Sequence, residues 1–469
     1  MSENTNRSEN SKTKRKYPFK IEHPTEEHRP ETMINAMKDI LNADIYKLPL
    51  SIYLDTCARC NTCSTTCHVY QTTGKVEDLP AYRSEKVRRI YKKYFSRSGR
   101  LFGRLAGAKE LSEDDINSLL ESAYRCTMCR RCNLECPMGV DNALITRIAR
   151  VMLSYLNLMP SNFEISVNSQ LEGETRNTSA IPRIAFLDTL EFLNEEIEEI
   201  VGCDMGFPID KEGSEILFIA PVSDYMMEAE TLMGNAVALN AAGADWTVGT
   251  EFYDAINYGL FYSDEKLEQI LQCVHAEAKR LKVKKIVVGE CGHATKTLKL
   301  FTEILCKDSP VEKIESVLEF TAHAIMDGKI KLDPSRVSET VTYHDPCNLG
   351  RMGGVLDEPR TILKACTDNF IEMSPTREEN YCCGGGGGTV TMDDIYDFRM
   401  NVAGKMKADQ MRSVGAHYVA APCANCKKQI RELIDFHKID STVVGVHDLV
   451  LKALVLDDAS QKKSDSDES

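Results

Sequence analysis

Residues 381–390 of this 469-residue chain read YCCGGGGGTV, so that Cys382 and Cys383 stand directly before the glycines at 384–388. Neighbouring side chains point in different directions, so an adjacent cysteine pair forms a disulfide poorly, whereas two thiolates readily share one polynuclear metal centre. Glycine lets a backbone approach a bulky group closely and offer N–H donors to it. A flexible loop that happens to carry two thiols is the alternative, and this stretch alone leaves both interpretations open.

The composition is that of a globular protein whose thiols stay reduced. With 42% hydrophobic residues, a chain of this length can form two or three domains. The formal net charge of -14 argues against a nucleic-acid partner, which would need a positive surface. The first residues have no apolar leader and no apolar run reaches membrane-spanning length, so we expect a cytoplasmic protein without a direct membrane span. In that compartment, the 18 cysteines indicate metal ligands or redox groups.

Two cysteine runs in the first third of the chain share the spacing C-x2-C-x2-C-x3-C. In two-cluster ferredoxins, the first three cysteines of such a run bind one cubane and the fourth binds the neighbouring one. Zinc is the alternative, although it usually binds two separated C-x2-C pairs. The spacing therefore predicts two [4Fe-4S] cubane clusters. We expect one on Cys57, Cys60, Cys63 and Cys136, and the other on Cys126, Cys129, Cys132 and Cys67.

The hydrophobic pattern changes along the chain, from helical periodicity to short apolar runs separated by longer amphipathic segments. Helical patterns surround the two cysteine runs, whereas later short apolar runs such as EILFIAP alternate with amphipathic segments, which is typical of an α/β fold. We expect a disordered or extended arm (1–40), a helical ferredoxin-like domain (41–160), a linker (161–212), two α/β halves (213–335 and 336–455) and a disordered tail (456–469).

The two α/β halves contain a short internal repeat. IVVGECGHATK (286–296) aligns with YVAAPCANCKK (418–428), which matches Cys291 with Cys423 and Lys296 with Lys428. FIAPVSD similarly aligns with YHDPCNL, but there a valine replaces the cysteine. The first half therefore reads as a degenerate copy of the second, although two unrelated strand-turn-helix units can also produce such a match.

Five cysteines of the second half fall at expected strand ends or in the glycine loop, where α/β sheets gather functional groups. Their pattern, C-x34-CC-x39-C-x2-C with Gly384 directly after the pair, resembles the cysteine-rich CCG domain of heterodisulfide reductases. The resemblance extends over nearly the whole chain, in the domain order of the D-type subunit. It implies an α+β multi-domain fold, in which a helical ferredoxin-like domain with two clusters precedes a pseudo-duplicated α/β CCG domain.

The resemblance also implies a site. In that family, five cysteines hold a noncubane [4Fe-4S] cluster at which a substrate S–S bond is reduced. Here they correspond to Cys347, Cys382, Cys383, Cys423 and Cys426. Gly384 and Gly385 would lie against the cluster. The degenerate half departs from the two-motif form because it keeps only Cys291, so we expect a single noncubane cluster.

The implied function is that of an oxidoreductase subunit. Within the family, the sequence is most similar to the iron–sulfur subunit of the membrane sulfite-reduction electron-transfer complex of sulfate reducers, with that of the type II cytochrome c complex close behind. Electrons would come from quinol through a cytochrome b-type membrane partner and reduce a disulfide or trisulfide on a small sulfur-carrier protein. The chain would then be cytoplasmic and attached peripherally to the inner membrane through partner subunits.

A pure electron-transfer subunit is the alternative function. Related CCG proteins serve flavin dehydrogenases of the glycolate or lactate oxidase type or the acyl-CoA dehydrogenase type, or a type II cytochrome c complex. In both readings a partner supplies the electrons, because no G-x-G-x-x-G fingerprint follows an expected strand and we therefore expect neither NAD nor FAD.

Several further side chains near the cysteines have two possible roles each. His293 is a candidate catalytic proton donor to the departing thiolate, and a structural imidazole is the alternative. His344, just before Cys347, is a candidate for orienting the cluster. Lys427 and Lys428 either balance the charge of the cluster or form a solvated helix face.

A basic stretch between residues 83 and 109 stands out in an otherwise acidic chain. Ten lysines and arginines lie there, interleaved with apolar residues such as Val87 and Ile90. Such a helix suits docking to a membrane partner or to the anionic inner leaflet, and a packed helix with a solvated basic face is the alternative.

Overall fold

The computed structural model describes residues 17–456, so residues 1–16 of the expected arm and nearly all of the expected tail lie outside the described residues. The rest of the arm differs from the expectation. Helix α1 spans Arg29–Asn42 and buries Met33 and Ile40. The physical reason is an apolar stripe at helical spacing, which needs a packing partner and finds one in the helical domain.

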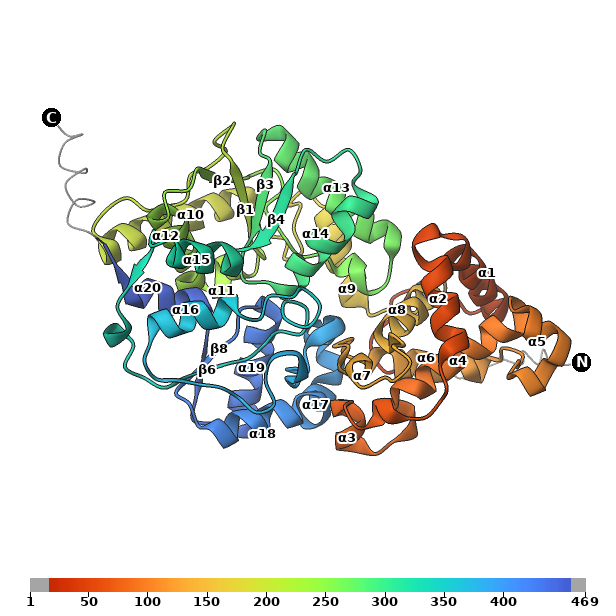
Figure 1. Ribbon diagram of the computed structural model, residues 1–469. Helices are drawn as coiled ribbons and strands as arrows, with labels where there is room; N and C mark the ends of the chain where they lie inside the picture. Colours follow the sequence, from red (N-terminus) through yellow and green to blue (C-terminus); the bar gives the residue numbers. More distant parts are fainter. Residues whose placement is uncertain (1–16, 457–469) are drawn as a thin grey trace, which may run out of the picture.

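Short helices surround both cysteine runs at one end of the molecule, coloured red to orange in Figure 1. Helix α2 (Asp44–Thr56) ends directly before Cys57, and α6 (Glu113–Tyr124) ends two residues before Cys126. Ser112 forms a capping box at the start of α6, as its sequence predicts. The other helices of this domain are α3 (His68–Thr73), α4 (Pro80–Tyr94), α5 (Arg97–Phe102), α7 (Arg131–Leu134) and α8 (Asn142–Ser154).

The segment 161–212, expected as a linker, is folded instead. It contains α9 (Ser161–Leu171) and α10 (Arg183–Val201), and both helices bury apolar residues in the protein core. The polar composition of the segment concealed them, because one or two apolar residues per helical turn are enough to anchor a helix against a larger core.

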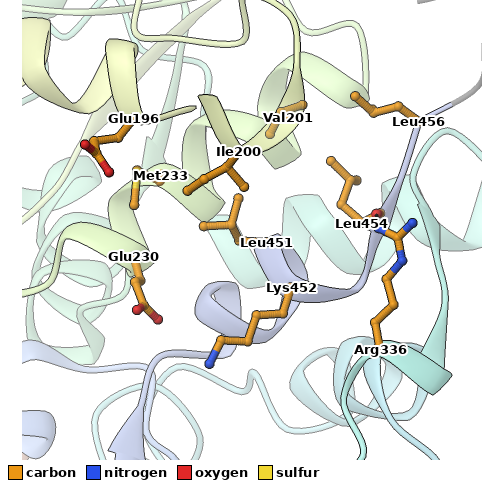
Figure 2. A pocket seen from close by; sticks show the side chains of 10 residues that line it. All are labelled: Glu196, Ile200, Val201, Glu230, Met233, Arg336, Leu451, Lys452, Leu454 and Leu456. Atoms are coloured by element: carbon orange, nitrogen blue, oxygen red, sulfur yellow. Dashed lines mark hydrogen bonds between the residues drawn. The ribbon is translucent and has the colours of Figure 1, made fainter. Parts of the chain in front are cut away.

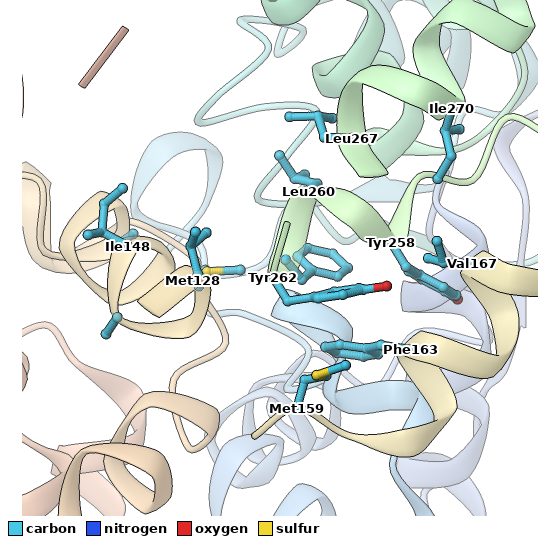
Figure 3. Packing of buried hydrophobic residues seen from close by; sticks show 14 of the residues in the cluster. Met128, Ile148, Met159, Phe163, Val167, Tyr258, Leu260, Tyr262, Leu267 and Ile270 are labelled. Carbon is cyan, nitrogen blue, oxygen red and sulfur yellow. The ribbon is translucent and has the colours of Figure 1, made fainter. Parts of the chain in front are cut away.

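Helix α9 joins the helical domain to the first α/β half through an aromatic cluster. The ring of Phe163 lies 6.0 Å from that of Tyr258 and 5.9 Å from that of Tyr262, both pairs stacked. Figure 3 shows these rings together with Met128 and Ile148 of the helical domain. The two parts of the chain therefore share one hydrophobic core.

Two parallel four-stranded sheets form the rest of the molecule, in the orders β2-β1-β3-β4 and β7-β6-β8-β9. The first sheet contains β1 (Ile216–Ile219), β2 (Trp246–Val248), β3 (Lys285–Val288) and β4 (Lys313–Ser316). The second contains β6 (Val341–Tyr343), β7 (Phe370–Ile371), β8 (Tyr418–Ala420) and β9 (Thr442–Val444). The same order in both sheets confirms the pseudo-duplicated α/β fold that the internal repeat predicts.

Helices cover both sheets, and the two halves are interlocked. The first half carries α11 (Asp224–Met227), α12 (Ala229–Ala241), α13 (Asp264–Arg280), α14 (Gly292–Leu305) and α15 (Val317–Met326). The second carries α16 (Glu358–Cys366), α17 (Tyr396–Phe398), α18 (Lys405–Val414), α19 (Ala424–His437) and α20 (Val446–Ala453). Short strands β5 (Lys331–Leu332) and β10 (Leu454–Val455) pair antiparallel across the halves.

Close helix packing also joins the halves, because α20 lies directly against α12. A Cβ atom at Gly234 of α12 would lie 2.0 Å from the carbonyl oxygen of His447 in α20, so this contact requires glycine. Among the described residues, no helix is long and apolar enough to cross a membrane.

Candidate iron–sulfur site

The first predicted cubane set lies near the protein surface. Cys63 is buried, Cys57 and Cys136 are partly exposed, and Cys60 is exposed. Burial raises the pKa of the Cys63 thiol, and the neighbouring thiols of Cys57 and Cys136 raise it further. Cys136 of the second run therefore lies near Cys57 and Cys63 of the first run.

The second predicted cubane set is more deeply enclosed. Cys129 and Cys132 are buried, while Cys67 and Cys126 are partly exposed. Burial raises the pKa of Cys132 well above its usual value, and the thiols of Cys129, Cys67 and Cys126 act in the same direction. His68, which follows the first run, places its Nδ1 atom 3.8 Å from the Sγ atom of Cys129.

The five cysteines of the CCG motif converge from separate elements. Cys347 follows β6, the pair Cys382 and Cys383 precedes the glycine loop, and Cys423 and Cys426 flank the start of α19. All five are buried. The Sγ atoms of Cys383 and Cys426 lie 3.4 Å apart. Cys382 also contacts Cys347, and Cys426 contacts Cys423, so the five thiols form one continuous set.

Two further cysteines extend this set at its ends. Cys129, from the second cubane set, contacts Cys382, and Cys291, from the degenerate half, contacts Cys423. Cys291 precedes α14 as Cys423 precedes α19, which follows the alignment of the repeat. The structure therefore connects the second cubane set directly with the CCG cysteines.

The glycine loop (384–388) packs closely against the cysteine sulfurs and against α9. The N–H groups of Gly384 and Gly385 each donate to a cysteine sulfur at 3.4 Å, those of Cys382 and Cys383 respectively. A Cβ atom at Gly388 would lie 2.3 Å from the Phe163 ring, so the loop fits against α9 only without side chains.

Two arginines connect the loop of the second cubane set with the loops that carry the CCG cysteines, and no sequence motif indicated them. Arg150 of α8 is fully buried and donates to the carbonyl oxygens of Cys126 at 2.8 Å and Gly387 at 2.6 Å. Arg351 donates to the carbonyl oxygens of Cys129 at 2.7 Å and Asn380 at 2.6 Å. The sequence signal for Arg150 was that two arginines, Arg147 and Arg150, interrupt a mostly apolar helical pattern.

Two nitrogen side chains lie beside the CCG cysteines. The ligand atoms of His344, Cys383 and Cys426 lie within 4.8 Å of one another, and burial lowers the pKa of His344 well below its usual value. Lys407 is also buried and donates to the side-chain oxygen of Asn380 at 2.7 Å. Burial lowers the pKa of Lys407 to about 7. Sequence analysis missed Lys407 because it lies in α18, far from any cysteine in the chain.

His293 lies in an aromatic environment. Its Nε2 atom is 2.7 Å from the carbonyl oxygen of Asn257, and its ring is 5.7 Å from Tyr258 and 4.9 Å from Phe261. Burial lowers its pKa to about 4, so the imidazole is neutral at physiological pH. This geometry favours the structural alternative over the tentative role as proton donor.

The basic pair after Cys426 divides into two different environments. Lys427 is buried and lies 3.9 Å from Asp224 and 3.7 Å from Glu228, whereas the Nζ atom of Lys428 donates to the carbonyl oxygen of Val390 at 3.3 Å. The expected solvated helix face is therefore wrong for Lys427. Its partners come from the first α/β half, which the local sequence does not reveal.

The two grooves of more than 600 Å³ are not lined by any cysteine of the three predicted ligand sets, although Cys273 lines one of them. A groove of about 620 Å³ between α10, α12 and α20 is lined by residues such as Ile200, Met233 and Leu451, and no cysteine lines it (Figure 2). Two smaller cavities border the cysteine loops. One of about 240 Å³ is lined by Ala424 and Asn425, between Cys423 and Cys426, and one of about 160 Å³ lies between the helical domain and the α/β halves.

The thiol sets fit iron–sulfur clusters chemically. All 18 cysteines carry free thiols, and soft sulfur ligands suit iron–sulfur centres. Backbone N–H groups also donate to predicted ligand sulfurs, and such bonds tune cluster potentials. These sulfurs are those of Cys126, Cys136, Cys382 and Cys383. The assignment of each cysteine to a particular cluster stays a prediction.

Known proteins resemble this chain in both parts. Residues 53–140 match the 4Fe-4S dicluster domain, and residues 341–431 match the cysteine-rich domain CCG. The chain is 32% identical to the Hdr-like menaquinol oxidoreductase iron-sulfur subunit 2 of Archaeoglobus fulgidus, over 94% of this chain and 86% of that protein.

Other relatives match with lower identity. The D-type subunit of the dihydromethanophenazine:CoB–CoM heterodisulfide reductase of Methanosarcina mazei is 26% identical, over 86% of this chain and 95% of its own length. The EtfAB:quinone oxidoreductase of Syntrophomonas wolfei is also 26% identical, over 86% of this chain but 58% of its own length.

Proposed function

This chain belongs to the heterodisulfide reductase D-like iron–sulfur proteins, and from that premise we propose that it passes electrons from a membrane quinol partner to a sulfur–sulfur bond. A cytochrome b-type subunit supplies the electrons, and a small sulfur-carrier protein presents the disulfide or trisulfide. The disulfide reaction is R–S–S–R′ + 2 e⁻ + 2 H⁺ → R–SH + R′–SH. The names of the Archaeoglobus and Methanosarcina relatives support a quinol-linked donor and a disulfide acceptor respectively.

The observation that carries this proposal is the contact between Cys129 and Cys382. When bound, iron–sulfur clusters supply one-electron storage, and the noncubane centre supplies iron that holds thiolates. The chain arranges its three thiol sets from the exposed Cys60 at the surface to the buried CCG cysteines. This order suits entry of electrons at the first set and reduction of substrate at the last.

The CCG cysteines, where the substrate would react, lie in a buried and firmly held site. The CCG cysteines are 2–8% exposed, so the fold largely excludes water from them. Arg150 and Arg351 hold the loops of the second cubane set and the CCG set against each other through backbone carbonyls. Fixed donors of this kind keep electron donor and acceptor at a constant separation.

Attachment to the membrane partner is supported by one exposed tip of the helical domain. In α4, Val87 and Ile90 are buried, so the apolar side of that helix packs in the core and is not free to dock. The segment after it instead exposes Leu101, Phe102 and Leu105 by 79%, 63% and 94%. Exposed apolar side chains beside arginines suit a peripheral contact at the inner membrane.

Electron paramagnetic resonance on anaerobically purified protein tests the proposed function. Oxidation with ferricyanide in the presence of a thiol should produce a new signal, because the thiolate binds at the CCG site. The signal should disappear in Cys383→Ser while the signals of the reduced cubanes remain. A thiol-dependent signal that survives in Cys383→Ser, or no such signal in the unmodified protein, would contradict the proposal.

A second candidate is an electron-transfer subunit that serves a flavin dehydrogenase and never meets a disulfide. The resemblance to EtfAB:quinone oxidoreductase favours it. Mixing the oxidised protein with a reduced electron-transferring flavoprotein separates the two functions. Rapid cluster reduction there, together with no thiol-dependent signal, would favour the second candidate.

A further inference from the structure

A cavity of about 160 Å³ lies where the helical domain meets both α/β halves. Thr127, between two ligands of the second cubane set, borders it together with Gly387 of the glycine loop. Asn348, directly after Cys347, and Lys296 of α14 line it as well. The cavity therefore adjoins both cysteine loops, and its volume suits one short organic group, because a water occupies about 30 Å³.

The charges around this cavity are paired with one exception. Nε of Arg130 donates to Asp141 at 2.8 Å, and Arg147 donates to Asp264 at 2.5 Å. The ammonium group of Lys296 has no hydrogen bond or ion pair with any residue that the structure describes. Because the nearby carboxylates already bind arginines, the cavity keeps one uncompensated positive charge.

Lys296 remains charged in this setting. Burial lowers its pKa to about 8, and the nearby guanidinium of Arg130 contributes. The ammonium form still predominates at pH 7. An unpaired ammonium in a small cavity attracts an anion more strongly than one in water, because the local dielectric is lower.

The internal repeat provides a comparison within the same chain. Lys296 is the fifth residue of α14, and Lys428, its repeat partner, is the fifth residue of α19. Lys428 lines a different cavity, of about 240 Å³, and its ammonium donates to the carbonyl oxygen of Val390 at 3.3 Å. Of these two lysines, Lys296 is the one whose ammonium has no hydrogen-bond partner among the described residues, and it lines the cavity next to Cys347.

We propose that Lys296 binds an anionic group, a carboxylate or sulfonate, on the thiol fragment that reacts at the CCG cysteines. This inference rests on the proposed function, because it requires a substrate thiol at that site. It assigns Lys296 the role of a specificity-determining residue: the ammonium selects anionic over neutral thiols and does not itself cleave the S–S bond.

A matched pair of thiols tests the assignment on the complete chain. 3-Mercaptopropionate and 3-mercaptopropionamide have nearly the same shape, but only the first carries a charge. Each is titrated into ferricyanide-oxidised protein, and the concentration that gives half of the thiol-dependent paramagnetic signal is measured. We expect the carboxylate to act at about tenfold lower concentration, which corresponds to about 1.4 kcal/mol.

Variants then locate the origin of this preference. In Lys296→Gln the two thiols should act at the same concentration, Lys296→Arg should keep part of the preference, and Lys428→Gln should keep all of it. An equal response to both thiols in the unmodified protein would overturn the inference, as would an equal weakening of both in Lys296→Gln. The absence of a signal with either thiol in the unmodified protein would instead overturn the proposed function, and the inference with it.

Discussion

Replacement of Arg150 by methionine should weaken the junction between the second cubane set and the CCG site. The guanidinium donates to the carbonyl oxygens of Ala123, Cys126 and Gly387, and it lies 4.4 Å from the ring centre of Tyr124. Methionine has a similar length but no donor. The variant therefore leaves these buried carbonyl groups without their partner.

The size of the effect follows from these contacts. A hydrogen bond to a charged group contributes about 1.5–3 kcal/mol; the bond to Cys126 holds the loop of the second cubane set, and the bond to Gly387 crosses to the CCG half. Methionine also removes the cost of burying a guanidinium, which offsets part of the loss. We expect a net decrease of about 2–4 kcal/mol in the free energy of unfolding.

Thermal unfolding of the anaerobic protein measures this change, and a decrease of about 2–4 °C in Tm is expected for a chain of this size. Arg89→Met on α4 is the control, because Arg89 only pairs with Glu85 near the surface. At unchanged iron content, reduction of the thiol-bound CCG centre should also be slower in Arg150→Met. A Tm within about 1 °C of the control, with an unchanged reduction rate, would refute this account of the junction.

Three further predictions concern single positions. Cys291→Ser should keep the full iron content, since the degenerate half is expected to bind no cluster, and iron analysis that shows a loss would make Cys291 a ligand. Gly388→Ala should lower the free energy of unfolding by about 1–3 kcal/mol, because its Cβ atom would lie 2.3 Å from the Phe163 ring. Thermal unfolding should show this as a lower Tm, and Phe163→Leu in the same chain should restore part of the lost stability. Burial lowers the pKa of His275 and His293 to about 4, below the 6.5 of an exposed imidazole. The unfolded chain therefore binds more protons between pH 6.5 and about 4, so denaturant titrations should show stability falling as the pH falls through that range, less so in His293→Asn.

The sequence predicted the features that depend on spacing along the chain. Cysteine spacing indicated the thiol sets that the structure assembles, such as Cys63 with Cys136 from the other run. The internal repeat indicated the matching order of the two sheets and the equivalent places of Cys291 and Cys423. Such features are predictable because they depend on the order and spacing of residues along the chain, which set the local geometry and the number of available ligands.

The residues that sequence analysis missed or misread act through tertiary contacts. In the sequence, Lys427 resembled a solvated lysine. In the structure it is buried, and its ammonium lies 3.9 Å from the carboxylate of Asp224 in the other half. Although burial opposes that charge, the carboxylates of Asp224 and Glu290 raise the pKa of Lys427. Arg150 likewise carries no motif, because its partners are backbone carbonyls, which every sequence contains.

Iron analysis of the anaerobically purified protein tests the central claim most directly. Three [4Fe-4S] centres require about 12 iron atoms per chain, and loss of the CCG centre in Cys383→Ser should leave about 8, with both cubane signals retained. About 8 iron atoms in the unmodified protein, or zinc in their place, would contradict the claim that the CCG cysteines hold a third cluster.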